Sequence, residues 1–257
     1  MAQILNPLAE HIKTVKQRLL IIGATIVLAM LVSFTFSGEM VAWLNRSFPN
    51  QLVFYGPTEA LFASIKVSFL AAIIASLPII FYQCWRFIAP ALLPKEQRWG
   101  LPLFAIAGAL FALGLIFCNL VILPLVIDFF VSFGMDHDVT PLLSVGTYID
   151  FNVKFLLIFG FAFELPLVLT ILARVGVVSA QILAKYRKYA IMAALILSAV
   201  VTPDATLFTM LLMAVPLMVL YEIGIIGARI FGRADPTKVN LPLDPDLPIG
   251  SAGQRVR

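Results

Sequence analysis

The segment FYQCWRFIAPALLPKEQR, residues 81–98, is a short charged interruption between two long apolar runs. Pro90 and Pro94 each disfavour a helical conformation in the residue that precedes them. The segment therefore predicts a shaped loop. The apolar runs on its two sides predict separate helices that cross a membrane.

The composition of the whole chain excludes a soluble globular protein. Hydrophobic residues make up 61% of the 257 residues and charged residues only 12%, and the mean hydropathy is +1.00. This balance is typical of a polytopic membrane protein. The two cysteines, Cys84 and Cys118, lie at the end of one apolar run and deep within the next, so they do not predict a disulfide.

Four apolar runs are long enough to cross a hydrocarbon core of about 30 Å. A further run, residues 190–221, is interrupted by Thr202, Pro203 and Asp204, and its two arms would rise only about 18 and 26 Å as helices. We interpret the arms as two short spans, with Asp204 able to cap the second. A re-entrant hairpin that never reaches the far side is the alternative. The predicted fold is an all-α membrane protein with six transmembrane helices, at residues 19–36, 61–85, 101–123, 151–173, 190–201 and 205–221.

Lysine and arginine are distributed unevenly between alternate loops. The segments predicted on one side of the membrane hold 15 of them, and the loops predicted on the other side hold one. Because basic loops stay in the cytoplasm, this asymmetry places both termini there. Lys66 and Lys154 lie near the outer ends of their spans, where long side chains can reach the interface. The basic segments are residues 1–18, 86–100, 174–188 and 224–257.

Residues 1–231 are predicted to form one membrane domain, and residues 232–257 a disordered cytoplasmic tail without an apolar period. Two outer segments, residues 39–48 and 125–133, mix aromatic and polar residues as short interfacial helices do, although ordinary loops are the alternative. Proline also recurs in the spans and is expected to bend several of them, which can create a concave wall. The prolines concerned are Pro78, Pro102, Pro124, Pro166 and Pro216.

Two carboxylates are candidates for function. Glu96, in the loop, can accept two parallel hydrogen bonds from an arginine guanidinium, or it can be a solvated residue balanced by Lys95 and Arg98. Glu164 lies about 20 and 14 Å along its helix from the two ends of the span, too deep to reach the headgroups easily. A protonated carboxyl or a water-filled groove would compensate, and a neutral structural role beside a neighbouring helix is the alternative.

The loop and three further segments resemble the TatC family, the receptor subunit of the twin-arginine protein translocase. The stretch YQCWRFIAPAL, followed by a short basic segment with a single Glu, carries the resemblance most specifically. It extends over about residues 8 to 230. The other matching segments, in the family's order and spacing, are PTEALFASIKVSFL at 57–70, FGFAFELP at 159–166 and VTPD at 201–204. The resemblance implies a concave, glove-like shape.

The same resemblance implies a binding site for twin-arginine signal peptides. Glu96 matches the family's position for contact with the twin-arginine motif, and Gln83 and Phe87 match neighbouring positions. Lys95 and Arg98 belong to the same basic segment.

The N-terminal part of the family site matches only in part. His11 and Arg18 agree with the family pattern, but Thr14 stands at the acidic position and Lys16 at the first arginine. The two-carboxylate clamp of the family is therefore not carried over. Recognition in this chain is expected to be weaker, to rely more on Glu96, or to be specialised.

For the single-span partners TatA and TatB, the resemblance implies contacts at Glu164, at Asp204 and on an exposed surface of the fifth helix that includes Met192 and Ser198. The predicted function is a noncatalytic translocase subunit of the bacterial inner membrane, with a thylakoid membrane less favoured. It binds signal peptides of folded precursors at the cytoplasmic face and recruits TatA, TatB and other TatC copies for transport driven by the proton motive force. No cofactor, metal or nucleic acid is expected.

Two other classes fit the sequence less well. A proton-coupled small-solute transporter could use Glu164, but it predicts inverted repeats and several deep ionisable residues, and the chain supplies essentially one. An intramembrane hydrolase requires a nucleophile with its base, or a metal set. The chain contains no G-x-S-x-G or H-E-x-x-H motif.

Overall fold

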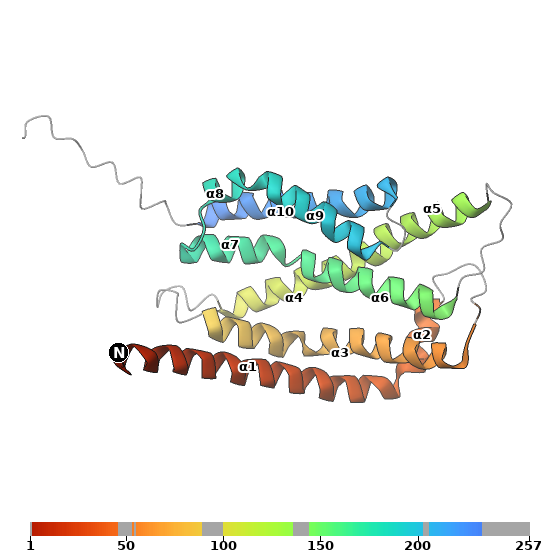
Figure 1. The fold of residues 1–257 in the computed structure, drawn as a ribbon, viewed down its shortest axis with the longest axis horizontal. Coiled ribbons are helices and arrows are strands. Elements are labelled where there is room, and N and C mark those ends of the chain that lie inside the picture. The colour runs from red at the N-terminus through yellow and green to blue at the C-terminus, as the bar shows by residue number, and fades with distance from the viewer. Residues whose placement is uncertain are drawn as a thin grey trace, which may run out of the picture.

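Long helices account for nearly all of the described chain in this computed structural model (Figure 1). The structure describes residues 2–45, 53, 55–88, 100–135, 144–202 and 206–232. Its elements are α1 (Ala2–Thr35), α2 (Ser37–Asn45), α3 (Pro57–Ile88), α4 (Gly100–Phe117), the π-helical turn η3 (Cys118–Ile122), α5 (Leu123–Met135), α6 (Val145–Ala162), α7 (Leu165–Val175), α8 (Ala180–Lys185), α9 (Arg187–Val201) and α10 (Leu207–Phe231).

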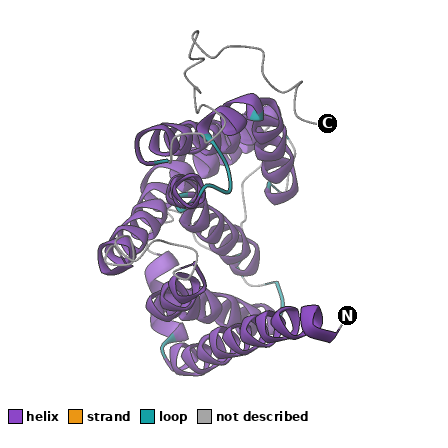
Figure 2. Cartoon of the chain, turned by 90° about the vertical axis from the view of Figure 1, so that its left-hand side faces the viewer, coloured by secondary structure: helices purple, strands orange, loops and turns teal. Residues whose placement is uncertain are grey.

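The helices are arranged in a curved row. α1 packs on α3, α3 packs on α4 and α6, and α10 packs on α7 and α9 (Figures 1 and 2). The start of α1 and the end of α10 lie at the same end of the molecule, together with the end of α3 and the start of α4 (Figure 1). The placement of this end in the cytoplasm stays a prediction.

The membrane character predicted from composition is confirmed by the lengths of the helices. Within the described residues, five helical stretches are long and apolar enough to cross a membrane. The first four correspond to the first four predicted spans. The stretches are Val15–Thr35, Thr58–Arg86, Pro102–Ser132, Val145–Val175 and Leu207–Phe231.

The last two predicted spans differ from each other in the structure. α9 has 15 residues and rises about 22 Å, so it is short, as expected. α10 has 25 residues and rises about 37 Å, so the prediction of a short last helix that ends at Tyr221 is wrong. The helix continues past Glu222 because a largely apolar run resumes at Ile223 and extends to Phe231. The exposed Glu222 carboxylate pairs with Arg187, with 2.7 Å between Oε2 and Nη2.

The third span continues beyond its predicted end at Leu123. The predicted separate helix at 125–133 is α5, which follows α4 without a break through the π-helical turn η3. Across this turn the Leu123 N–H donates to the carbonyl of Cys118, five residues earlier. The wider turn directly precedes Pro124, which has no N–H to donate to a preceding carbonyl.

The fourth span is divided into two helices. α6 ends at Ala162 and α7 begins at Leu165, so that Phe163 and Glu164 lie at the junction, next to Pro166. By contrast, α3 and α10 continue as helices through Pro78 and Pro216. The predicted proline bends stay a prediction.

α6 occupies the centre of the main core and has ten buried residues. Its approach to α4 is close because glycines face each other there. A Cβ atom added to Gly114 of α4 would lie 2.6 Å from the carbonyl oxygen of Phe159, and one added to Gly160 of α6 would lie 2.7 Å from the Phe111 ring. Small residues allow membrane helices to pack at this short separation.

Gly114→Ala is expected to lower the free energy of unfolding in detergent by about 1–3 kcal/mol, because the added methyl group overlaps the backbone of α6. Gly108→Ala on the same helix is the matched control, because nothing lies within 4 Å of its added Cβ. This control is expected to leave stability unchanged or to raise it by up to about 1 kcal/mol through helix propensity. Thermal unfolding of both variants tests the packing, and equal stability would contradict it.

Candidate functional site

The basic start of α1 lies against the end of α3. Arg18 Nη1 donates a long hydrogen bond of 3.5 Å to the backbone carbonyl of Gln83. The Gln83 side chain is buried, whereas Lys16, two residues before Arg18, is exposed. The structure thus brings together two segments of the predicted signal-peptide site that are 65 residues apart in the sequence.

Other predicted members of this site fall outside the described part of the structure. His11 and Phe87 belong to α1 and α3, but their side chains are not described. The loop residues Lys95, Glu96 and Arg98 of this site also lie outside the described residues, as does Asp204, which was predicted to contact partners. Glu96 follows the end of α3 at Ile88 by eight residues, so the chain enters its loop from the end where Arg18 meets Gln83.

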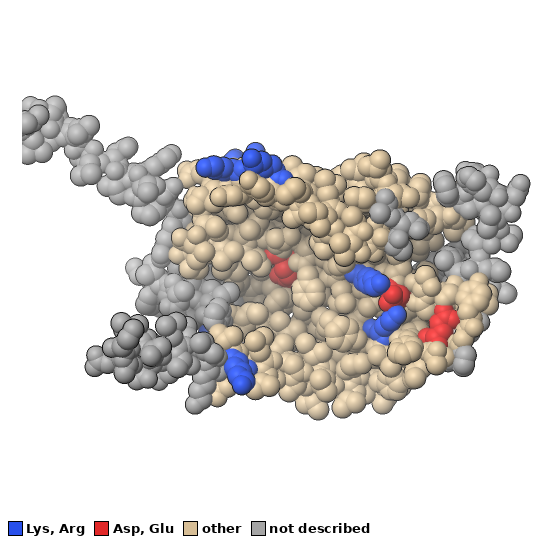
Figure 3. Space-filling view, in the orientation of Figure 1, with Lys and Arg blue, Asp and Glu red and all other residues tan. Residues whose placement is uncertain are grey.

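A groove of about 250 Å³ surrounds the second predicted carboxylate. Glu164 lies at the junction of α6 and α7 and is only 8% exposed. Among the described residues, its Oε1 atom has no hydrogen-bond partner. Acidic atoms are visible in a hollow on the face shown in Figure 3. The walls come from α3, α4, α6 and α7 and are almost entirely apolar, with Phe81, Cys84, Trp85, Phe104, Phe161 and Leu167 among them.

Glu164 is a polar group with an unused hydrogen-bonding atom in an apolar groove. A buried carboxyl oxygen without a partner costs free energy, which a donor from a second molecule would recover. The groove at Glu164 is lined by apolar side chains, and the expectation that it is filled with water stays a prediction.

The two sequence-predicted residues on α9 do not share one face. Met192 is 53% exposed, as expected. Ser198 is fully buried and its hydroxyl donates to the carbonyl of Ala194 at 2.7 Å, so the expectation that it lies on the exposed surface is wrong. The exposed surface of α9 is formed instead by Met192, Ile196 and Val200, at helical spacing.

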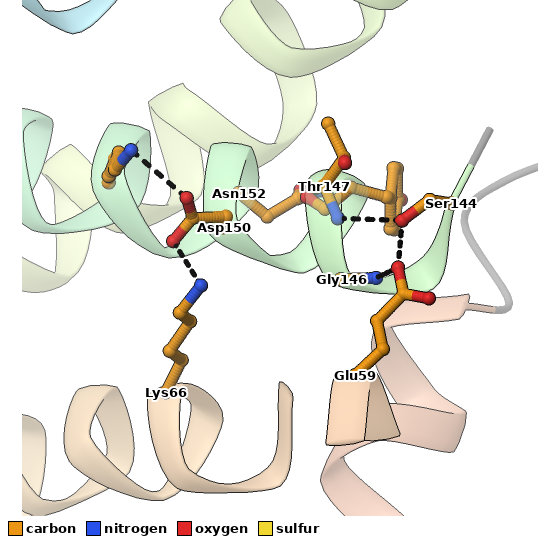
Figure 4. A network of polar contacts seen from close by, with 9 residues as sticks. Glu59, Lys66, Ser144, Gly146, Thr147, Asp150 and Asn152 are labelled. Carbon is orange, nitrogen blue, oxygen red and sulfur yellow. Dashed lines mark hydrogen bonds and ion pairs between the residues drawn. The ribbon is translucent and has the colours of Figure 1, made fainter. Parts of the chain in front are cut away.

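Sequence reasoning missed a polar network at the opposite end of α3 and α6 (Figure 4). Lys66 Nζ lies 2.7 Å from Asp150 Oδ1, and Lys154 Nζ lies 3.0 Å from Asp150 Oδ2. The two lysines were expected to reach the interface separately. The i,i+4 spacing of Asp150 and Lys154 was a readable signal, but the contact with Lys66 joins different helices and has no local signature.

A second part of this network joins the starts of α3 and α6. Glu59 Oε1 accepts hydrogen bonds from the Ser144 hydroxyl and from the Gly146 N–H, the latter at 2.8 Å. The Ser144 hydroxyl in turn accepts from the Thr147 N–H at 3.2 Å and caps α6. A carboxylate at a helix N-terminus also interacts favourably with the helix dipole. Glu59 therefore fixes the start of α6 relative to α3.

Comparison with known proteins identifies a consistent set of relatives. Residues 10–216 match the family model described as Sec-independent protein translocase protein (TatC). The "Sec-independent protein translocase protein TatC" of Aquifex aeolicus is 38% identical over 233 residues, which are 88% of this chain and 96% of that protein. The protein TatCy of Bacillus subtilis is 32% identical over 225 residues, 86% of this chain and 88% of its own.

The fold is also similar to a solved structure. The protein described as "Crystal Structure of Twin Arginine Translocase Receptor- TatC" matches with a TM-score of 0.79 and 38% identity, over 87% of this chain and 100% of the other. A second crystal structure of that receptor, in DDM, gives a TM-score of 0.78 at 37% identity. The arrangement of helices described above is therefore shared with experimentally determined structures.

Glu164→Leu is expected to raise the free energy of unfolding in detergent by about 1 kcal/mol, because it removes a buried oxygen without a partner. Glu164→Gln, which keeps the size and polarity of the side chain, is the control and should gain less. Denaturation of the purified protein measures both. A clear loss of stability in Glu164→Leu would show that the carboxyl has a structural partner.

Proposed function

The chain belongs to the TatC family of Sec-independent protein translocase proteins, and from this premise we propose that it binds the twin-arginine signal peptides of folded precursor proteins. The resemblance drawn from its motifs is confirmed by the family match. The family is a component of a protein translocase, and this favours the translocase function over the small-solute transporter. The chain's apolar helices make it a multi-pass membrane protein.

The contact between Arg18 and the Gln83 carbonyl is the observation that supports the proposed site best. It joins the basic N-terminal segment to the end of α3, from which the loop with Glu96 continues. A signal peptide bound at this end would meet both segments at once. In this proposal Glu96 supplies the carboxylate that binds the signal peptide. The buried Gln83 and its neighbours support the end of α3, from which the loop continues.

Charge explains why Glu96 would carry most of the recognition. An arginine guanidinium binds a carboxylate through two parallel hydrogen bonds, with a geometry that lysine does not reproduce. In the N-terminal segment, Thr14 offers a hydroxyl and Lys16 a positive charge, so neither attracts a guanidinium as a carboxylate does. We therefore assign the paired arginines of the signal to Glu96.

The groove at Glu164 would receive a helix of a single-span TatA- or TatB-type subunit. Its apolar walls suit a membrane helix, and the Oε1 atom suits one polar donor on that helix. The exposed face of α9 with Met192 extends the apolar surface available to partners. In this proposal the protein lies in the bacterial cytoplasmic membrane, with both termini in the cytoplasm, and transport is driven by the proton motive force.

Photocrosslinking of a twin-arginine signal peptide to the protein in native membranes tests the receptor function. Glu96→Ala is expected to reduce crosslinking about tenfold, the effect of losing one charge-assisted bidentate contact. Thr14→Glu is expected to increase crosslinking, because it adds a carboxylate on the N-terminal segment.

Glu222→Gln is the matched control, since it removes a carboxylate that is exposed and paired with Arg187 rather than with a substrate. A peptide with paired lysines in place of the arginines controls for the signal. Equal crosslinking in the native chain and in Glu96→Ala, or equal crosslinking of the two peptides, would contradict the proposal.

A further inference from the structure

The cluster formed by Lys66, Asp150 and Lys154 carries an excess of positive charge on helices that are otherwise apolar. Two ammonium groups share one carboxylate, so the cluster has a net charge of +1. Within the described part of the chain, no other acidic side chain pairs with either lysine. One positive charge of the cluster therefore has no acidic partner among the residues that the structure describes.

The hydrogen-bonding capacity of the cluster is also incomplete. Each ammonium group has three N–H donors, and the ion pair with Asp150 uses one direction of each. Both oxygens of Asp150 are occupied, one by each lysine. The two lysines thus bind different oxygens of one carboxylate, with N–H donors left over on both ammonium groups.

The cluster is accessible from outside the protein. The side chains of Lys66, Asp150 and Lys154 are 38%, 34% and 58% exposed. In Figure 3, two basic groups flank an acidic group on the surface shown. An anion could therefore approach the cluster without a change in the fold.

The depth of the cluster identifies the kind of anion. Lys66 and Lys154 lie five and three residues inside the predicted spans, which begin at residues 61 and 151, or about 8 and 5 Å along their helices. This places them near the boundary between the headgroups and the hydrocarbon. An uncompensated charge is costly at this depth, and long side chains direct it towards headgroups.

We propose that Lys66 and Lys154 bind the phosphate group of an anionic membrane phospholipid, which goes beyond the proposed binding of signal peptides. The phosphate anion would neutralise the excess charge and accept the unused N–H donors of both lysines. Asp150 would compete with the phosphate for the two ammonium groups, because it occupies one donor direction of each. Phe161, which is 50% exposed, lies seven residues after Lys154, on the same face of α6 and about 10 Å along it, where an acyl chain would extend.

Native mass spectrometry of the full chain, released from nanodiscs of phosphatidylcholine with a minor share of phosphatidylglycerol, tests the site. The native protein should retain phosphatidylglycerol in preference to phosphatidylcholine. The double variant Lys66→Gln with Lys154→Gln should lose this preference by about tenfold, as expected for the loss of charge-assisted hydrogen bonds. Lys185→Gln with Lys188→Gln, at the opposite end of the helices, is the matched control and should behave as the native chain does.

Asp150→Asn separates lipid binding from a purely structural ion pair. This variant raises the charge of the cluster and frees both lysines for a phosphate, so retention of phosphatidylglycerol should increase severalfold. The thermal stability of each variant is measured in detergent without lipid. Lipid retention is compared only between variants that are as stable as the native chain. Unchanged retention in the double lysine variant, or decreased retention in Asp150→Asn, would overturn the proposal.

A competition arm distinguishes a lipid phosphate from free phosphate. Inorganic phosphate and glycerol phosphate, added to the nanodiscs before release, should not displace phosphatidylglycerol, because they lack acyl chains along α6. Displacement by either anion at concentrations similar to that of the lipid would overturn the assignment to a lipid. Because crosslinking of signal peptides reports on Glu96, which is not part of the lysine cluster, the failure of one proposal can be told from the failure of the other.

Discussion

α6 is held between α3 and α4 by contacts that leave little freedom in spacing. Within lipid, apolar surfaces gain little by burial against each other, so close packing and polar contacts must hold helices together. Gly114 and Gly160 bring the backbones of α4 and α6 close, and Glu59 fixes the start of α6 to α3. The positions of the groove at Glu164 and of the lysine cluster both follow from this placement, since each lies on α6 and a neighbour.

Polar groups on these apolar helices are compensated in different ways. Glu59 is saturated by donors from the start of α6 and from Tyr55, whose N–H lies 2.8 Å from Oε2. Asp150 is saturated by two lysines, which leaves a positive charge in excess. Glu164 has an oxygen without any partner among the described residues. Glu59 is therefore a structural carboxylate, because its hydrogen bonds are made within the protein. At Asp150 with its lysines, and at Glu164, a second molecule would supply the missing charge or hydrogen bond.

Local sequence signals predicted the helices well and their lateral contacts poorly. The lengths of the apolar runs gave the first four spans, because each run is limited by polar residues or proline. Asp150 was counted with a loop, since its lysine partner on α3 is 84 residues away. The end of α10 was missed because the single carboxylate of Glu222 was taken as a boundary, although a largely apolar run resumes at Ile223. Ser198 was a different kind of error: residues six apart point about 120° away from each other around a helix, so its separation from Met192 was readable.

α3 connects the two proposed sites, and this has a mechanical consequence. The helix carries Glu59 and Lys66 near its start and Gln83 near its end, and it continues through Pro78 without interruption. A change that moved the start of α3 relative to α6 would therefore also move the residues that meet Arg18. Removal of the charge on Lys66 leaves the Glu59 contacts to Ser144 and Gly146 intact, so α3 should keep its position when the lipid is lost. The two sites share a rigid element, but the contacts that fix that element are distinct from those that would bind the lipid.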